Sequence, residues 1–136
     1  MYEGWEMDVH TKIYNRLLSY TVQNGMGTAN IDAYRKSDVP STFPFILVDL
    51  LPAVEQGMDL EGKTVNGGLF TFQIDVYDNN DYPTKAKKIM GDITQIMKGL
   101  RFEVIAMPSF ERQDKLHRCT ARFRRMIGAD DNYMSM

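Results

Sequence analysis

Apolar and polar residues alternate most regularly in the segment 67–78. The apolar residues there occupy every second position: Phe70, Phe72, Ile74 and Val76. Because successive side chains of a strand point to opposite faces, this period of two predicts a strand with one buried face. The polar run Asp78–Asp81 predicts the turn that ends the strand, since Asp and Asn side chains hydrogen-bond nearby backbone groups.

Helical spacing occurs first in residues 7–24, where apolar residues recur every three or four positions: Val9, Ile13, Leu17 and Tyr20. This stripe predicts an amphipathic helix. Asp8 is a candidate N-cap, and Gly25 is a candidate stop, because glycine readily adopts the left-handed conformation that ends many helices. His10 lies in the first turn and is expected on the solvated surface.

A second apolar stripe predicts a helix over residues 83–99: Ala86, Ile89, Met90, Ile93, Ile96, Met97 and Leu100. Pro83 suits the first turn, where its missing N–H group has no helical partner to lose, and Gly99 suits the end. Four lysines lie on the opposite surface of this helix: Lys85, Lys87, Lys88 and Lys98. They predict a solvated helix face.

Three further segments, 43–51, 102–107 and 116–127, predict strands, because they are rich in β-branched and aromatic residues or alternate in polarity. Pro108 is expected to end the second of them, since proline cannot donate a hydrogen bond to a strand ladder. Residues 109–115 are expected to form the turn before the third.

The order helix, strand, strand, helix, strand, strand predicts one α+β domain over residues 1–136. We expect a mainly antiparallel four-stranded sheet with both helices packed on one face, because each helix must bury its apolar stripe against the sheet. Residues 25–42 and 52–66 are expected to be long loops, the first of which reaches a partner. Residues 129–136 are expected to be a flexible C-terminal tail.

The composition, 43% hydrophobic and 25% charged residues, is typical of a globular protein. The single cysteine, Cys119, excludes an internal disulfide framework and fits a reducing compartment. The acidic N-terminal segment lacks the apolar core of a signal peptide, and no run approaches the roughly 20 apolar residues of a membrane helix. A cytoplasmic protein without membrane contact is therefore expected.

Charge is distributed unevenly along the chain. Residues 1–82 hold 12 acidic and 5 basic side chains, a net charge of −7, whereas residues 83–136 hold 6 acidic and 11 basic side chains, a net charge of +5. Such polarity favours head-to-tail self-association through complementary fields. The alternative, that folding interleaves the two signs on one surface, stays open.

Candidate metal and catalytic groups are sparse. His117 and Cys119 share a strand face, but a zinc site needs three or four ligands and the only other histidine, His10, is far away in sequence. Three aspartates form a second group: Asp75, Asp78 and Asp81. This group lacks the glycine and the distal glutamate of a calcium loop. The sequence therefore predicts no metal, no cofactor and no catalytic residue, which argues against an enzyme.

Arginines are concentrated in the strand 116–127. Arg118, Arg122 and Arg124 share one face of that strand, and Arg125 lies on the other. Like charges along one sheet face repel unless they are solvated or meet carboxylates, and arginine pairs with carboxylates and phosphates in many interfaces. Three interpretations stay open: a subunit interface, an ordinary wet surface and a DNA contact.

The layout resembles the tail-terminator (tail-completion) proteins of long-tailed bacteriophages and prophages. The points of likeness are the length, the opening helix, the lysine-bearing second helix and three strand segments: Phe43–Val48, Gln73–Asn79 and Arg122–Arg125. Together these points of likeness cover most of the chain. They consist of a shared pattern of residue types and elements, not of an invariant sequence motif.

This resemblance implies a non-enzymatic ring, typically of six subunits, that caps the head-proximal end of the tail tube. Such a ring stops tube elongation and offers the surface that joins the head. The implied partners are further copies of the chain, the tail tube protein and the head connector or head-completion protein. DNA would pass through the ring without specific binding. The implied location is the virion tail, after assembly in the host cytoplasm.

A ring of identical subunits needs two different, complementary patches on each subunit. We hypothesise that a basic patch meets an acidic patch of the next subunit. The basic candidates are Arg118, Arg122, Arg124 and Arg125, and the acidic candidates are Asp49, Glu55, Asp59 and Glu61. Two alternatives stay open: a head-completion or adaptor protein of the same virion, and a small nucleic-acid-binding module whose DNA binding would weaken with salt.

Overall fold

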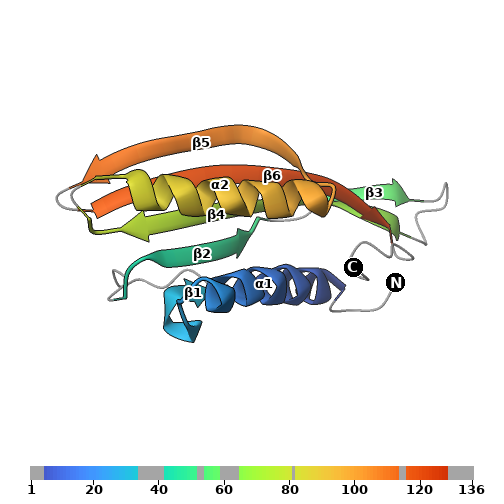
Figure 1. The fold of residues 1–136 in the computed structure, drawn as a ribbon. Coiled ribbons are helices and arrows are strands. Elements are labelled where there is room, and N and C mark those ends of the chain that lie inside the picture. The colour runs from blue at the N-terminus through green and yellow to red at the C-terminus, as the bar shows by residue number, and fades with distance from the viewer. Residues whose placement is uncertain are drawn as a thin grey trace.

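The computed structural model describes residues 5–33, 42–51, 54–58, 65–80, 82–113 and 116–128. Two α-helices, α1 (Trp5–Gln23) and α2 (Thr84–Gly99), and a short 3-10 turn, η1 (Thr28–Asn30), lie beside one sheet (Figure 1). The six strands of the sheet are β1 (Ile31–Asp32), β2 (Phe45–Leu50), β3 (Val54–Met58), β4 (Val65–Asp78), β5 (Glu103–Gln113) and β6 (Leu116–Gly128). Neither α1 nor α2, as far as they are described, is long and apolar enough to cross a membrane.

β4 is the strand on which the sheet is built. The strand order is β1-β2-β4-β6-β5, and β3 also pairs with β4. β4 runs antiparallel to β2, β3 and β6, whereas β1 runs parallel to β2. The predicted α+β class and the mainly antiparallel pairing are therefore confirmed. The sheet is nevertheless mixed, and it has six strands rather than the four predicted.

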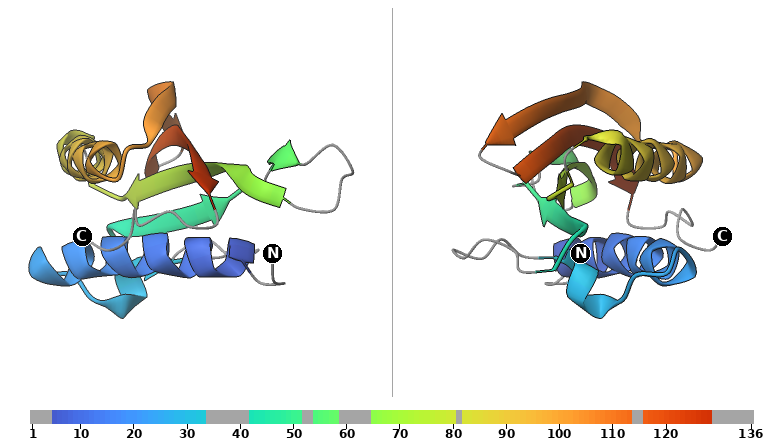
Figure 2. Two further views of the ribbon diagram at one scale, coloured as in Figure 1. Left: turned by 90° about the vertical axis from the view of Figure 1, so that its right-hand side faces the viewer. Right: turned by 60° about the vertical axis from the view of Figure 1, so that its left-hand side comes forward.

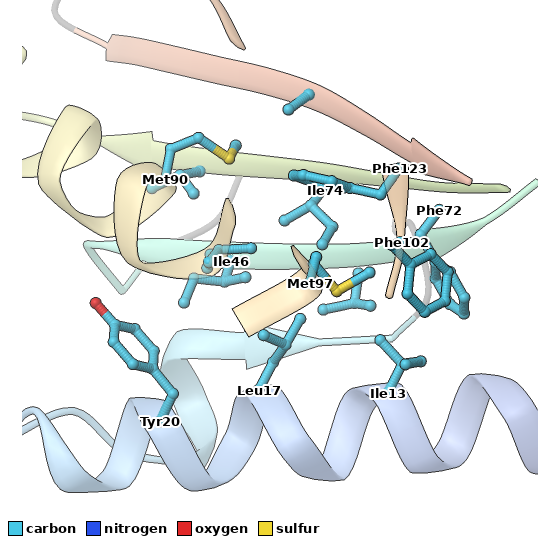
Figure 3. Close-up of a cluster of buried hydrophobic side chains, with 14 of the residues drawn as sticks. Ile13, Leu17, Tyr20, Ile46, Phe72, Ile74, Met90, Met97, Phe102 and Phe123 are labelled. Atoms are coloured by element: carbon cyan, nitrogen blue, oxygen red, sulfur yellow. The ribbon is translucent and has the colours of Figure 1, made fainter. Parts of the chain in front are cut away.

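One face of the sheet and the two helices enclose the hydrophobic core (Figure 3). The alternating apolar side chains of β4 are all fully buried: Phe70, Phe72, Ile74 and Val76. Ile13 and Leu17 of α1 and Met97 of α2 point into the same cluster. Because both helices bury their stripes in one cluster with this face of β4, the prediction that they pack on one face is confirmed.

The predicted end of β4 is confirmed as well. The carboxylate of Asp78 accepts hydrogen bonds from the Asn79 backbone N–H at 3.0 Å and from the Asn80 side-chain amide at 2.7 Å. These local hydrogen bonds form directly after the last paired residue of β4, in the stretch that leads toward α2.

Two strands lie inside segments that the sequence predicted as loops. β1 falls within residues 25–42 and β3 within residues 52–66. β2 pairs with β4 from Phe72 onward, whereas β3 pairs with the residues of β4 that precede Phe72. β3 therefore supplies hydrogen-bond partners to backbone groups of β4 that β2 does not reach. It lies at one end of the sheet, beyond the C-terminal end of α2 (Figures 1 and 2). The rest of the predicted loops (34–41, 52–53 and 59–64) and the predicted tail (129–136) fall outside the described residues.

β5 passes through Pro108, where the sequence predicted that the strand would end. β5 is the last strand in the sheet order, and the edge of a sheet is where proline is tolerated. Its register with β6 also shifts on both sides of Ala106, an irregularity at which a missing N–H group is readily accommodated. Of the residues 109–115 that the sequence predicted as a turn, residues 109–113 belong to β5, and residues 114–115 fall outside the described part of the chain.

α1 ends as predicted but begins earlier than predicted. It starts at Trp5, so Asp8 lies inside the helix and is not its N-cap. At the other end, Gly25 has a φ angle of 79°, and the N–H of Met26 donates to the Thr21 carbonyl at 3.0 Å. This left-handed glycine closes the helix.

His10 is buried, contrary to the expectation of a solvated side chain. It is only 8% exposed, and its Nε2 donates to the carbonyl oxygen of Val48 in β2 at 2.9 Å. Its ring lies 5.9 Å from the ring of Phe72, centre to centre. Because β1 pairs only with the residues of β2 that precede Val48, the histidine satisfies a carbonyl beyond the reach of that short strand.

α2 ends with a left-handed residue that is not glycine. Gly99 is the last helical residue, whereas Arg101 has a φ angle of 68°. The N–H groups of Arg101 and Phe102 donate to the carbonyls of Lys98 and Met97, at 2.9 Å each. The helix end is thus closed by hydrogen bonds, at the cost of holding a Cβ atom in an unfavourable backbone conformation.

Arg101→Gly is expected to raise the free energy of unfolding by about 1 kcal/mol, because glycine adopts a positive φ without the Cβ clash. Urea unfolding followed by circular dichroism measures the change. The control is Lys98→Gly, inside the last helical turn, which should lower the free energy by up to about 1 kcal/mol. A loss of stability in both variants would contradict the assignment of strain to Arg101.

Candidate functional site

The arginine face is the sheet surface opposite the helices, made by Arg118, Arg122 and Arg124 of β6 and the side chains beside them on β4 and β5. The three arginines lie opposite Tyr77, Gln73 and Thr71 of β4, respectively. The β6 residues of the other face are fully buried in the core: Cys119, Ala121, Phe123 and Ile127. The predicted division of this strand into a basic face and an apolar face is therefore confirmed.

A buried ion pair anchors the arginine face. Asp75 of β4 is fully buried, and Nη2 of Arg118 donates to its carboxylate at 3.2 Å. The hydroxyl of Thr120 donates to the other carboxylate oxygen at 2.7 Å. Because a buried carboxylate without a partner is strongly destabilising, the first role of Arg118 and Thr120 is to compensate Asp75.

The Tyr77 ring and a second carboxylate lie close to the guanidinium group of Arg118. Its guanidinium carbon lies 5.8 Å from the centre of the Tyr77 ring, within range of a cation–π interaction. Tyr77 in turn packs against Phe45, with 6.3 Å between ring centres. Glu111 of β5 approaches Arg118 to 3.9 Å from a more exposed position. Arg118 is therefore committed to its own subunit.

Arg124 and Arg122 differ in how their charges are neutralised. Arg124 forms an ion pair with Glu103 of β5, with 2.6 Å between the nearest nitrogen and oxygen. Arg122 is exposed, and its Nε donates to the neutral amide oxygen of Gln73 at 3.0 Å. Among the described residues, no carboxylate forms an ion pair with Arg122. It is the arginine of this face whose charge is available to another molecule.

Asp49 is the acidic candidate that the structure brings to the arginine face. It lies opposite Gln73, on the same face as Arg122 and two strands away, a separation of about 10 Å at ordinary strand spacing. Glu55 lies in β3, and Asp59 and Glu61 fall outside the described residues. The pairing of acidic and basic patches between subunits therefore stays a hypothesis.

Arg125 lies on the helix side of β6, apart from the other arginines. Its Nη1 donates to the carbonyl oxygen of Leu100 at 2.9 Å, directly after α2. A cation at the C-terminal end of a helix satisfies a carbonyl that has no helical partner and opposes the negative end of the helix dipole. Arg125 therefore has a structural role at the end of α2.

Cys119 and His117, the candidates for metal or nucleophile chemistry, are both buried. Cys119 is fully buried, and burial raises the pKa of its thiol to about 11. His117 is 7% exposed and lies opposite Asp78 in the strand register. Within the described ranges, no cluster of three or more His, Cys, Asp and Glu side chains could hold a metal ion. Both residues belong to the packed interior.

The Cys119 thiol is expected to react with a disulfide reagent at pH 8 about a hundredfold more slowly in the native protein than in the unfolded chain. Its raised pKa leaves little thiolate, and burial blocks access. Absorbance of the released thiolate follows the reaction. A variant with an added surface thiol, Ser19→Cys on the exposed side of α1, supplies the fast control. Equal rates for both thiols would contradict the burial.

No protein-family model and no curated protein sequence matches this chain. Among solved structures, one match is a chain of the structure described as the virion of a native gene transfer agent (GTA) particle. The superposition covers 88% of this chain and 94% of that chain, with a TM-score of 0.54 and 20% sequence identity. The two chains share a fold. Because the superposition extends over most of both chains, the likeness concerns the whole domain rather than one hairpin.

Proposed function

We propose that this chain is a structural virion protein that forms a ring at the head-proximal end of a phage-like tail tube. The ring stops tube elongation and offers the surface that joins the head, without catalysis and without a cofactor. The observation that carries the proposal is the fold shared with a chain of the GTA virion over 88% of this chain. The resemblance of Phe43–Val48 and Arg122–Arg125 to tail-terminator segments supports the finer assignment.

The arginine face supplies one of the two patches that the ring requires. Arg122 is exposed and has a neutral partner, so a carboxylate of the next subunit can neutralise it. The acidic patch would contain Asp49 together with Glu55, Asp59 and Glu61. β3, which carries Glu55, lies at the end of the sheet, a position from which it can meet a neighbouring subunit (Figure 2).

Six copies would form the ring, between the tail tube protein on one side and the head connector or head-completion protein on the other. DNA would pass through without sequence-specific binding. The charges of Arg118 and Arg124 are already paired with carboxylates of the same chain, which favours a protein interface over a DNA contact.

The position of the protein in purified particles tests this assignment. A short gold-binding tag placed before residue 5 lies outside every described element, and electron microscopy of labelled particles locates it. We expect gold at the junction of head and tail, and no gold on particles with the untagged chain. Gold along the tube or over the capsid would contradict the proposal. Gold on filled heads that lack tails would favour the head-completion or adaptor alternative.

A further inference from the structure

A cavity of about 420 Å³ lies where the C-terminal end of α1 meets the start of α2. Its walls come from the end of α1 and the turn after it, from η1, from residues 42–44 and from the first turns of α2. Hydrogen bonds hold these walls in place. The side-chain amide of Asn24 donates to the Tyr20 carbonyl at 2.8 Å, and that of Asn30 donates to the Pro44 carbonyl at 2.7 Å. The cavity is therefore a built feature of the fold.

Positive charge lines this cavity. Lys85 and Lys88 both contribute to its wall. Asp92 is already engaged, because its carboxylate accepts hydrogen bonds from Tyr20 at 2.7 Å and from Lys88 at 3.2 Å. The bond from Tyr20 is the main reason that the pKa of Asp92 lies below its usual value. Lys85 forms no ion pair with any carboxylate in the part of the chain that the structure describes.

The remaining walls define what kind of ligand would fit. α2 begins without a side-chain cap and without an acidic residue in its first turn, so neither of these features, within residues 82–99, compensates the positive end of its dipole. Met26, Phe43 and Ile89 contribute apolar surface to the same cavity. A matching ligand combines carboxylates with an apolar side chain.

We propose that this cavity binds residues 129–134 of a second copy of the chain. Their sequence is Ala129-Asp130-Asp131-Asn132-Tyr133-Met134. The two adjacent carboxylates match the unpaired Lys85 and the start of α2, and the tyrosine and methionine that follow match the apolar wall. The contact rests on the proposed ring, to which it adds a second attachment between neighbours, separate from the arginine face.

The topology makes this contact intermolecular. Gly128 ends β6, whereas the cavity lies near the other end of that strand, where His117 is opposite Asp78 and the chain leads into α2. β6 has 13 residues and therefore spans about 40 Å. Asp130 follows Gly128 by two residues and can move about 7 Å from it. The acidic pair cannot reach the cavity of its own subunit, but it can reach that of a neighbour in a head-to-tail ring.

Disulfide trapping in purified particles tests the contact. The chain with Lys85→Cys and Asp131→Cys is assembled into particles and oxidised, and its size is read on a non-reducing gel. We expect a ladder of covalent multimers, because each subunit can form one disulfide through position 85 with one neighbour and a second through position 131 with the other neighbour. Cys119 is buried and stays silent. The matched control replaces Lys85→Cys by Lys98→Cys, at the far end of α2, and is expected to give at least tenfold less multimer.

The outcomes separate this contact from the ring itself. If the variant chain is present in particles but yields no more multimer than the Lys98→Cys control, the contact with residues 129–134 is overturned while the ring proposal survives. If the unmodified chain is absent from particles, the proposed function fails first. A charge exchange gives a second measure: Lys85→Asp should lower particle yield at least tenfold, and Asp130→Lys in the same chain should restore it. Failure of that restoration would also count against the contact.

Discussion

Arg122→Glu is expected to reduce the yield of complete particles at least a hundredfold while the monomer stays folded. Arg122 is exposed and donates one hydrogen bond to the neutral Gln73, so its loss should cost the monomer less than about 1 kcal/mol. In the ring, the same change would place a new carboxylate against the acidic patch of the next subunit. Like charges at an interface cost several kcal/mol, which is enough to prevent assembly. Complementation of a particle whose own gene is interrupted measures the yield.

Arg16→Glu provides the matched control for that experiment. Arg16 is an exposed arginine of α1, away from the arginine face, and its reversal changes the net charge by the same amount. It should leave particle yield unchanged. Combining Arg122→Glu with Asp49→Arg should restore part of the yield if these residues meet across the interface. Normal assembly of the Arg122→Glu variant would rule the pairing out.

Arg118→Ala is expected to lower the free energy of unfolding by about 2–3 kcal/mol, because it leaves the buried carboxylate of Asp75 without its charged partner. The expected loss lies below the range for fully buried pairs for two reasons. Arg118 is 32% exposed in its side chain, and Thr120 retains its hydrogen bond to Asp75. Urea unfolding followed by circular dichroism measures the change.

Arg124→Ala is the control for this measurement, since its pair with Glu103 is exposed and should contribute less than about 1 kcal/mol. Adding Asp75→Asn to Arg118→Ala should recover part of the lost stability, because a buried amide needs no counter-charge. Equal losses for Arg118→Ala and Arg124→Ala would contradict the distinction between a buried and an exposed pair.

The elements that could be predicted from the sequence are those with strong periodicity. β4 and β6 alternate regularly, and both helices carry a sustained apolar stripe, so their faces follow from local geometry alone. β1 and β3 have no such pattern. They are short and are strands only because β2 and β4 offer them backbone partners, which is information that lies elsewhere in the chain.

Two errors share a similar cause. His10 was expected on the solvated surface as a residue of the first helical turn, yet it forms a hydrogen bond with Val48, 38 residues away. Pro108 was expected to end a strand, yet β5 is at the edge of the sheet and irregular around Ala106, where proline is accepted. In both cases the position of the residue in the folded protein determined its environment, and the neighbouring sequence alone did not reveal that position.

The sequence predicted that the three arginines share one side of the sheet, but it did not predict which side chains they contact. Alternation along β6 placed Arg118, Arg122 and Arg124 together, whereas their partners depend on the register with β4 and β5. Asp75, considered beforehand only as a member of an aspartate group, is the buried partner of Arg118. That register is what distinguishes Arg122 from the two arginines that already have carboxylates.

Tail length in the absence of the protein tests the central claim most directly. The gene is interrupted early in the phage or prophage that carries it, and tails in the lysate are measured by negative-stain electron microscopy. The account predicts tubes of uncontrolled, mostly excessive length that are not attached to filled heads. Supplying the chain from a plasmid should restore tails of uniform length. Tails of normal length, with or without attached heads, would contradict the claim that this protein ends tube growth.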